Sequence, residues 1–408
     1  MKPSSGVAIV GGGPCGSFTA LNLAQHEVDV SVFEEHNEIG VPSHCAGHLS
    51  ISGLKRLGLF PLPNGIVENT FRGAVFHSPN CKRFSVHFTS PVTCVVNRTS
   101  FDKHIARMAE TAGAKYFLNS KVESLLIKDS FASGIVVKKE GKTEERFPAK
   151  IVIDTEGIFP KILRQTGLVE PNRQKFVNGA EAEVENADNL EKDIVEVFLG
   201  RKFAPDFYAW IIPKGSGRAG VGLGAKFGNP KRLLESFMLK HPIASKKLRS
   251  ARIRQIAFHP LTLGGMIPKT YSDGFLAVGD CASQVKPTTG GGVILGLNCG
   301  KIAAEIAYEA VQKDDFSSNI LRSYQKKCEK FLGFDLAVML RARRFLDSMS
   351  DEKLDNIIGF CASMGLDKVL EKVEDVDFQG RTFLHSLRNP RVPVTFLYFL
   401  FSWLSANI

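Results

Sequence analysis

The first fifty residues alternate between apolar runs and a stretch with helical periodicity. An apolar run at residues 7–10 leads through a glycine-rich turn into residues 17–25, whose apolar positions recur at helical spacing, and a second apolar run ends at Glu34. Strand, helix and strand in this order predict a βαβ unit in a parallel sheet. The next loop, residues 36–48, is punctuated by glycine and proline and is longer than a plain connection, which is typical of a functional loop.

Farther along, apolar and polar residues alternate with a period of two over many short segments, which predicts β-strands. These segments are residues 71–77, 83–88, 114–117, 122–127, 180–185, 194–199, 207–212, 220–225 and 252–258. Helices are predicted at residues 98–112, 230–239 and 292–312, and another is predicted to begin near Pro160. A β-hairpin is predicted with its turn at Glu140 and Gly141, followed by a separate buried strand at residues 150–154.

Together these elements predict an α/β protein, α+β overall, with three regions. A Rossmann-like cofactor-binding domain is expected to comprise residues 1–70, 96–172 and 266–335. An inserted, mostly antiparallel β-sheet is expected to form a substrate domain from residues 71–95 and 173–265. A C-terminal helical region with an apolar, aromatic tail is expected at residues 336–408.

The C-terminal tail, residues 392–408, contains no charged side chain and several aromatic ones. It is shorter than the roughly 20 apolar residues that a membrane-spanning helix needs. Two interpretations remain: a terminal helix that covers a domain, or an interfacial anchor or the rim of a lipid tunnel. An excess of lysine and arginine in the chain favours the second.

The glycine-rich turn has the spacing of a dinucleotide-binding motif, with Gly11, Gly13 and Gly16 between a strand and a helix. Gly11 permits the tight turn, Gly13 lets the backbone approach a pyrophosphate, and Gly16 allows close packing of helix and strand. Glu34 ends the second strand, where a carboxylate can accept the ribose hydroxyls of FAD or NAD. A second copy of the glycine spacing, residues 215–220, precedes a strand and is therefore expected to be a hairpin turn.

Composition narrows the range of functions. The 408 residues are 44% hydrophobic and carry a net charge of +10, which suits anionic membranes or phosphate-bearing substrates, or simply a solvated basic surface. No nucleic-acid recognition motif is present. The eight cysteines are scattered without a CxxC pair, which argues against zinc, iron–sulfur clusters, any other bound metal and a disulfide framework, and suits a reducing cytosol. A cleavable signal is not expected, because the first apolar run is the cofactor strand.

Three motifs carry a resemblance to a known family. Residues 274–292, with Asp280 at a strand end and the run Gly290-Gly291-Gly292, resemble the flavoprotein hydroxylase superfamily and, within it, the geranylgeranyl reductase family. Pro205-Asp-Phe-Tyr208-Ala-Trp210-Ile-Ile-Pro213-Lys-Gly215 resembles the PxxYxWxFPxG motif of that family, with Ile212 in place of phenylalanine. His44-Cys45-Ala46-Gly47 resembles its cysteine-containing loop, with His48 where a second glycine is common. Thr155-Glu156-Gly157 replaces the usual Asp-Gly pair and so removes support for the hydroxylase branch.

The resemblance implies FAD as cofactor and assigns residues to it. The residues expected to contact FAD are Gly11, Gly13, Cys15, Gly16, Glu34, Cys45, Ala46, His48, Arg98, Val122, Asp280, Gly290, Gly291, Gly292 and Val293. Arg98 and Asp102 match the Arg-x-x-x-Asp arrangement of the superfamily. Asp280 can accept a ribityl hydroxyl, and the glycine run lets the backbone approach the flavin at a helix N-terminus.

The activity implied is reduction of the C=C bonds of geranylgeranyl chains in archaeal membrane glycerophospholipid biosynthesis. A hydride from reduced flavin N5 and a proton must reach adjacent carbons that no carbonyl polarises. Tyr208 and Trp210 share one face of a strand and are expected to bind the prenyl chain, or else form a core pair. Cys45 is the candidate proton donor or flavin-tuning group, or else a packing residue, and His44 and His48 could relay protons.

Rival functions predict different partners. An FAD monooxygenase would consume oxygen and NAD(P)H and hydroxylate a ring, which the Tyr208/Trp210 motif disfavours. An electron-transferring flavoprotein dehydrogenase usually carries a cluster-binding cysteine set, which is absent from this sequence. A flavin-bound lipid carrier is the non-catalytic alternative. For the reductase, the electron donor is NAD(P)H or a ferredoxin, and the expected location is the cytoplasm, with peripheral contact to the cytoplasmic face of an anionic membrane.

Overall fold

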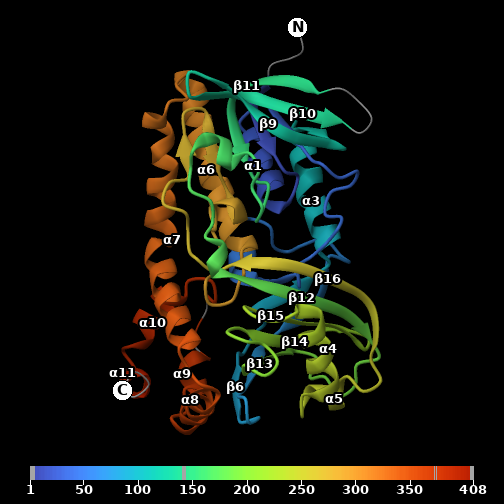
Figure 1. The fold of residues 1–408 in the computed structure, drawn as a ribbon, viewed down its shortest axis with the longest axis vertical. Coiled ribbons are helices and arrows are strands. Elements are labelled where there is room, and N and C mark those ends of the chain that lie inside the picture. Colours follow the sequence, from blue (N-terminus) through green and yellow to red (C-terminus); the bar gives the residue numbers. More distant parts are fainter. Residues whose placement is uncertain (1–4, 140–143, 372, 374, 405–408) are drawn as a thin grey trace. The chain divides into compact units, whose positions relative to one another are not determined.

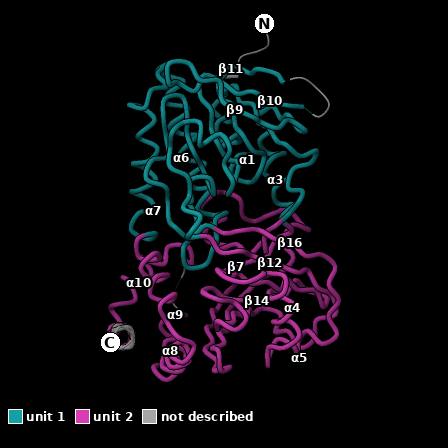
Figure 2. The backbone as a smooth tube through the Cα atoms, viewed as in Figure 1, with its two compact units in different colours: residues 1–43, 98–175, 262–336 teal, residues 44–97, 176–261, 337–408 magenta. Residues whose placement is uncertain are grey.

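The computed structural model describes residues 5–139, 144–371, 373 and 375–404. The chain divides into two compact units, each assembled from three separate stretches (Figure 2). Unit 1 comprises residues 1–43, 98–175 and 262–336, and unit 2 comprises residues 44–97, 176–261 and 337–408. The assignment of a cofactor domain and a substrate domain stays a prediction, since compactness alone gives neither unit a function.

Unit 1 is built on a sheet with the order β17-β18-β11-β1-β2-β8, of which Figure 1 labels β11. Its strands are β1 (Ser5–Val10), β2 (Val30–Phe33), β8 (Lys115–Phe117), β11 (Glu145–Asp154), β17 (Tyr271–Ser272) and β18 (Phe275–Ala277). All neighbouring pairs are parallel except β17 with β18. Residues 7–10 are buried, as a parallel strand covered on both faces requires. The predicted fold class, with a Rossmann-like sheet here, is confirmed.

Helix α1 (Pro14–Ala24) packs between two other helices of unit 1, α3 (Arg98–Thr111) and α6 (Val293–Lys313). The helices predicted at residues 98–112 and 292–312 are thereby confirmed. Three short 3₁₀ helices also occur: η1 (Leu163–Thr166), η2 (Arg173–Lys175) and η3 (Gly279–Ala282). The first turn of α1 follows β1 directly, which places the glycine motif at the carboxyl end of the parallel sheet.

Two local predictions in unit 1 are wrong. Residues 145–154 form one strand, β11, which begins antiparallel to β10 (Phe131–Lys139) and ends parallel to β1, so that one strand serves two partners. The predicted turn at Glu140 and Gly141 lies outside the described residues.

No α-helix begins near Pro160, because the Glu156 carboxylate accepts the backbone N–H groups of the next turn. Only the short 3₁₀ helix η1 follows. Strand β9 (Ser120–Lys128) pairs with β10.

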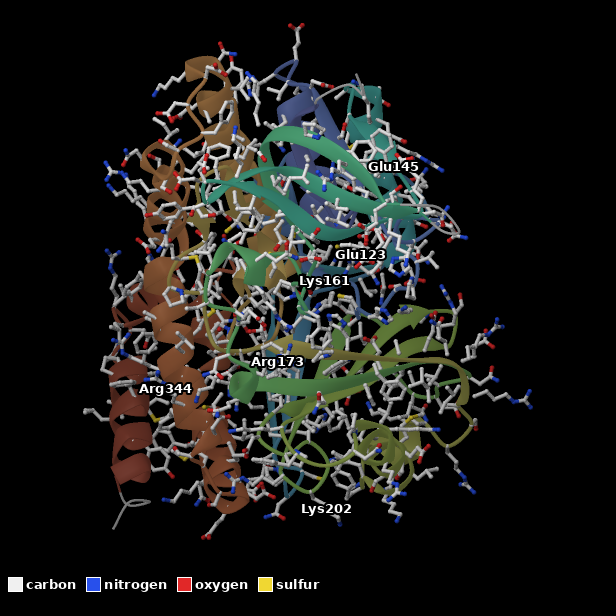
Figure 3. All side chains as sticks on the ribbon, turned by 45° about the horizontal axis from the view of Figure 1, so that its top comes forward. Glu123, Glu145, Lys161, Arg173, Lys202 and Arg344 are labelled. Carbon is white, nitrogen blue, oxygen red and sulfur yellow. The ribbon has the colours of Figure 1, made fainter. Side chains whose placement is uncertain are left out.

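Lys161 in this turn has a partner on a neighbouring strand. Its ammonium group pairs with the Glu123 carboxylate of β9, and Figure 3 shows the two side chains close together. This pair lowers the pKa of Glu123, chiefly through its hydrogen bond with Lys161. The contact fixes the chain after β11, where a longer helix was predicted.

Unit 2 is built on a seven-stranded sheet with the order β16-β12-β15-β14-β13-β5-β6. Its strands are β5 (Gly73–His77), β6 (Arg83–His87), β12 (Phe176–Glu185), β13 (Ile194–Leu199), β14 (Tyr208–Gly215), β15 (Arg218–Ala225) and β16 (Arg252–Thr262). From β12 to β6 the pairs are antiparallel except β13 with β5. The predicted, mostly antiparallel sheet is confirmed. A smaller sheet contains β3 (His48–Ser50), β7 (Thr93–Val96) and β4 (Val67–Phe71), and β3 leads into α2 (Ile51–Arg56).

The second glycine motif is a hairpin turn, as predicted. Strand β14 ends at Gly215 and β15 begins at Arg218, and the three residues from Gly215 to Gly217 have positive φ angles. Both strands pair over most of their length. No helix follows the turn, so it lacks the N-terminus that binds phosphate in a dinucleotide motif.

The two faces of the seven-stranded sheet differ. One is covered by α4 (Pro230–Lys240) and α5 (Ala244–Lys247), which pack on a core that includes Phe198 and Leu223. Alternate residues of the same strands point to the other face. That face carries Trp210, Val195 and Ile212, and we call it the aromatic face.

The C-terminal helices are α7 (Ser318–Asp347), α8 (Asp351–Ser363), α9 (Asp367–Leu370), α10 (Gln379–Ser386) and α11 (Arg391–Leu404). Buried carboxylates tie this region to the rest of unit 2: Asp355 accepts hydrogen bonds from Ser78 and Asn80, and Asp377 accepts one from Ser50. Among the described residues, no helix combines the length and the apolar character needed to cross a membrane.

Candidate cofactor and substrate sites

The three motif glycines of unit 1 have different surroundings. Gly11 has a φ of +99°, and a Cβ there would lie 2.6 Å from the Thr155 carbonyl oxygen. A Cβ on Gly16 would lie 2.0 Å from the Gly11 carbonyl oxygen. At Gly13, by contrast, no heavy atom of the described residues lies within 4 Å of the Cβ position. Gly11 and Gly16 therefore serve the fold, whereas Gly13 leaves an open approach to the helix N-terminus.

That open space faces the first turn of α1, whose backbone N–H groups have no partner within the helix. Gly13 is the N-cap residue, and among the described residues no side chain caps it. Unfilled N–H groups and the positive end of a helix dipole favour an anion such as a pyrophosphate. The structure of this turn therefore fits a dinucleotide.

Glu34 lies directly after β2 and is anchored to the same turn. Its Oε2 accepts the backbone N–H of Gly12 at 2.7 Å, and its Oε1 pairs with His36 Nδ1 at 2.6 Å. Each carboxylate oxygen has two lone pairs, so Glu34 retains acceptor capacity for a ribose hydroxyl. The side chain is thus held where the sequence motif requires a ribose acceptor.

A second glycine-rich segment precedes α6. Gly290 has a φ of +72°, and a Cβ on Gly292 would lie 2.8 Å from Asp280 Oδ1, so only glycine lets this carboxylate approach the start of α6. Burial raises the pKa of Asp280, and the charge of Arg98 opposes that shift. Arg98 itself pairs with Asp102 at 2.9 Å. Two predicted FAD residues from separate segments of unit 1, Arg98 and Asp280, therefore interact electrostatically.

Other predicted cofactor residues of unit 1 have packing roles in the structure. The Cys15 sulfur fits between two glycines, because a Cβ would lie 3.1 Å from it on Gly279 and 2.5 Å from it on Gly296. Burial raises the pKa of Cys15, so its thiol stays neutral. Val122 is a buried core residue of β9, and Val293 is the first residue of α6. Backbone contacts from these residues to a cofactor remain predictions.

The cysteine-containing loop belongs to unit 2. Cys45 is exposed, and its sulfur accepts the Gly47 backbone N–H at 3.5 Å. His44 stacks on His259 of β16 with ring centroids 5.6 Å apart, and His48 Nε2 lies 2.7 Å from the Thr93 hydroxyl. Ala46 packs against the apolar cluster that includes Trp210. The structure thus brings this loop and the aromatic motif to one cluster.

Tyr208 and Trp210 are in contact on the aromatic face, as their spacing predicts, with ring centroids 5.7 Å apart and planes at 60°. The Trp210 indole lies over Gly222 of β15, where a Cβ would be 2.4 Å from Cζ2. Gly220 and Gly224 continue the same face of β15, and we call these three alternate positions the glycine strip. Glycine at alternate positions in a strand marks a close approach, here by side chains of neighbouring strands.

Sequence reasoning missed Glu181. It lies on β12 directly opposite Gly222, and its Oε1 would be 2.7 Å from a Cβ on Gly220. The alternation of alanine, valine and glutamate in β12 is typical of a half-solvated strand and gave no sign of a functional acid. The available signal was the glycine strip, which indicates that side chains of both neighbouring strands lie across β15.

Comparisons with known proteins first identify the class of fold. Residues 9–48 match the model of an NAD(P)-binding Rossmann-like domain. A geranylgeranyl bacteriochlorophyll reductase-like structure from Thermoplasma acidophilum has the same fold, with a TM-score of 0.85 and 24% identity over 97% of this chain and 99% of that one. A halogenase solved in complex with FAD gives a TM-score of 0.67 at 14% identity, covering 93% and 87% of the two chains. The chain therefore has a Rossmann-like domain within the fold that these structures share.

The family follows from the second unit and from curated relatives. Residues 177–257 match the geranylgeranyl reductase catalytic domain. Digeranylgeranylglycerophospholipid reductase 2 of Methanopyrus kandleri is 35% identical over 86% of this chain and 88% of that protein. The Methanocaldococcus jannaschii digeranylgeranylglycerophospholipid reductase is 34% identical with the same coverage. The chain belongs to the geranylgeranyl reductase family, which confirms the resemblance found in the sequence.

Proposed function

We propose that this protein reduces the C=C bonds of geranylgeranyl chains with FAD as its cofactor, and that its substrates are archaeal membrane glycerophospholipid precursors. The observation that carries the proposal is the contact of Tyr208 with Trp210, whose indole lies over the glycine strip, within the segment that matches the reductase catalytic domain. The names of the relatives support the same substrate class.

FAD, when bound, supplies the hydride. Its pyrophosphate would lie at the open N-terminus of α1 beside Gly13, and Glu34 would accept a ribose hydroxyl. Asp280 would accept from the ribityl chain, and residues 290–293 would let the backbone approach the ring. The proposed set of FAD contacts also includes Arg98, Cys15 and Val122 and the loop residues Cys45, Ala46 and His48.

The residues of the aromatic face would supply position and a dry surface. An alkene that no carbonyl polarises gains little from a hydrogen bond, so its alignment and the exclusion of water must provide much of the acceleration. Tyr208 and Trp210 offer adjoining ring faces to a prenyl chain. The π face of Trp210 would also stabilise positive charge that develops on carbon. Cys45 would donate a proton or tune the flavin.

An anaerobic experiment tests this function. The purified flavoprotein is reduced with dithionite and mixed with digeranylgeranylglyceryl phosphate, and flavin absorbance is followed together with product mass. The expected result is flavin reoxidation and a gain of two hydrogens per reduced double bond. Reduced flavin that ignores the lipid, but oxidises rapidly in air with hydroxylation of an aromatic substrate, would replace this proposal with a monooxygenase.

We also infer that α10 and α11 contact an anionic membrane, with the enzyme on its cytoplasmic face. Among the side chains that the structure describes there, four apolar ones are about half exposed or more: Leu384, Val394, Phe396 and Leu397. Arg381, Arg388 and Arg391 are exposed in the same segment, and the sequence from residue 378 to 408 has no acidic residue. Exposed apolar side chains flanked by arginine are typical of a helix that lies in the interface of an anionic membrane.

Vesicle flotation tests this contact. The full-length protein is expected to float with phosphatidylglycerol vesicles, less so at high salt, because arginine contacts are screened. Phe396→Ser with Leu397→Ser should weaken binding at least about tenfold, since two apolar side chains lose their burial in lipid. A matched control replaces Phe227 and Leu239, 61% and 75% exposed on other elements, by serine. Equal binding by all three proteins would contradict the inference.

A further inference from the structure

Glu181 is a carboxylic acid on the aromatic face that the proposed mechanism has not used. Glu181 projects from β12 toward the glycine strip, and Trp210 projects from β14 over the same strip. In the sheet register both residues are paired with Gly222, one on each side of β15. The two side chains therefore converge over a strand that has no side chains of its own on this face.

The basic residues nearest to Glu181 form ion pairs with other carboxylates. Lys214 and Arg218 pair with Glu68, at 3.3 Å and 3.1 Å, and both also approach Glu183 within 3.7 Å. Among the described residues, Glu181 takes part in no ion pair. The Trp210 indole N–H is buried and makes no hydrogen bond of good geometry within the described part of the chain, although it lies near this carboxyl group.

The environment favours the acid form of Glu181. Burial raises its pKa to about 7, and the positive charge of Lys214 opposes this shift, as does the nearby Trp210 N–H. The side chain keeps some solvent exposure but lies within a dense part of the protein, so its charge is poorly hydrated. A group that is about half protonated at neutral pH can both give up a proton and recover it from water.

We propose that Glu181 is the general acid of alkene reduction and donates its carboxyl proton to one carbon of a double bond held against Trp210. The inference rests on the proposed function. The π electrons of the alkene form the new bond to this proton, and the neighbouring carbon receives the hydride with its two electrons from reduced flavin. Glu181 is left as a carboxylate and regains a proton from water. Cys45, which is exposed, then keeps only its role as a flavin-tuning group.

A fluorescence titration tests the ionisation of Glu181 independently of turnover. The chain has two tryptophans, so Trp403→Phe leaves Trp210 as the sole indole. Protonation of an adjacent carboxylate changes indole emission, and we expect a transition near pH 7 in the full-length protein. Adding Glu181→Gln should abolish the transition, whereas adding Glu183→Gln, on the same face of β12, should retain it. A transition that survives Glu181→Gln would overturn the assignment.

Single-turnover kinetics test the catalytic role. For the wild-type protein, prereduced and mixed anaerobically with the prenyl lipid, the reduction rate is expected to fall above about pH 7, because the acid form is the donor. Glu181→Gln should lower the rate about 100-fold and remove this pH dependence, without weakening lipid binding. Glu181→Asp should recover part of the rate. Glu183→Gln should keep the pH dependence, with its midpoint moved to lower pH, because the charge of Glu183 helps to raise the pKa of Glu181.

The outcomes separate the two proposals. A wild-type protein that reduces the lipid, together with a Glu181→Gln variant of unchanged rate and pH profile, would overturn the acid role and leave the reductase function intact. Loss of the rate in Cys45→Ser, with a normal rate in Glu181→Gln, would return the donor role to Cys45. A wild-type protein that reduces no prenyl lipid would overturn the function and the acid role with it.

Discussion

Replacement of Gly13 by alanine is expected to release the flavin while leaving the protein folded. Gly13 has a φ of −65°, which alanine adopts without strain, and no heavy atom of the described residues lies within 4 Å of its Cβ position. An added methyl group would therefore occupy only the space in front of the α1 N-terminus. Because a pyrophosphate there would lose contact with the backbone N–H groups, FAD affinity should fall about 100-fold or more.

Gly16→Ala is the matched variant with the opposite expected phenotype. Its Cβ would lie 2.0 Å from the Gly11 carbonyl oxygen and 2.6 Å from Thr155 Oγ1, so the turn itself must move. The free energy of unfolding should fall by about 3 kcal/mol or more, whether or not flavin is present. Urea unfolding and flavin fluorescence on the two variants measure both effects. A Gly13→Ala protein that retains stoichiometric FAD would place the pyrophosphate elsewhere.

The parts of this fold that the sequence predicts are those in which neighbouring residues carry the signal. The βαβ unit follows from apolar runs with helical and strand periodicity, and the hairpin at residues 215–217 follows from the strand that comes next. Both are local patterns. The same holds for Tyr208 and Trp210, since residues two apart in a strand share a face and here make contact.

The errors arise where a distant or competing contact decides the local structure. The strand β11 continues through residues 148–150 because β10 and β1 pair with its two ends in turn. The helix near Pro160 is replaced because Glu156 satisfies the N–H groups of Lys161 and Ile162. The periodicity of each segment reveals neither the second sheet partner of β11 nor the competing carboxylate of Glu156.

Glu181 illustrates the same limit for the candidate site. Its strand alternates apolar and acidic residues, and Glu183 and Glu185 occupy equivalent positions in that pattern. Only the pairing of β12 with β15 sets Glu181 opposite Gly222 and hence beside Trp210, while Glu183 is paired with Gly220 and lies near Lys214 and Arg218. Register between strands, which the local sequence does not reveal, thus separates the candidate acid from its neighbours.

Gly222→Ala is expected to lower the rate of alkene reduction by at least about 100-fold, because it moves the ring that positions the substrate. A Cβ at this position would lie 2.4 Å from Cζ2, 2.5 Å from Cε2 and 2.8 Å from Nε1 of Trp210. The indole is rigid, so the whole ring must shift by about 1 Å to restore normal contacts. Because the Tyr208 ring contacts the indole, the indole cannot shift toward Tyr208.

A double substitution separates this effect from general damage to the sheet. Trp210→Phe removes the indole atoms that the new methyl group would meet, so Gly222→Ala should cost little more in a Trp210→Phe protein. The double variant and Trp210→Phe alone are therefore expected to reduce the prenyl lipid at similar rates, both faster than Gly222→Ala alone. Stopped-flow reoxidation of the reduced flavin, with circular dichroism to verify folding, measures the three variants. If the Gly222→Ala protein instead reduced the lipid at the wild-type rate, the orientation of Trp210 would have no part in the chemistry. The aromatic face would then be a packed core rather than a substrate surface.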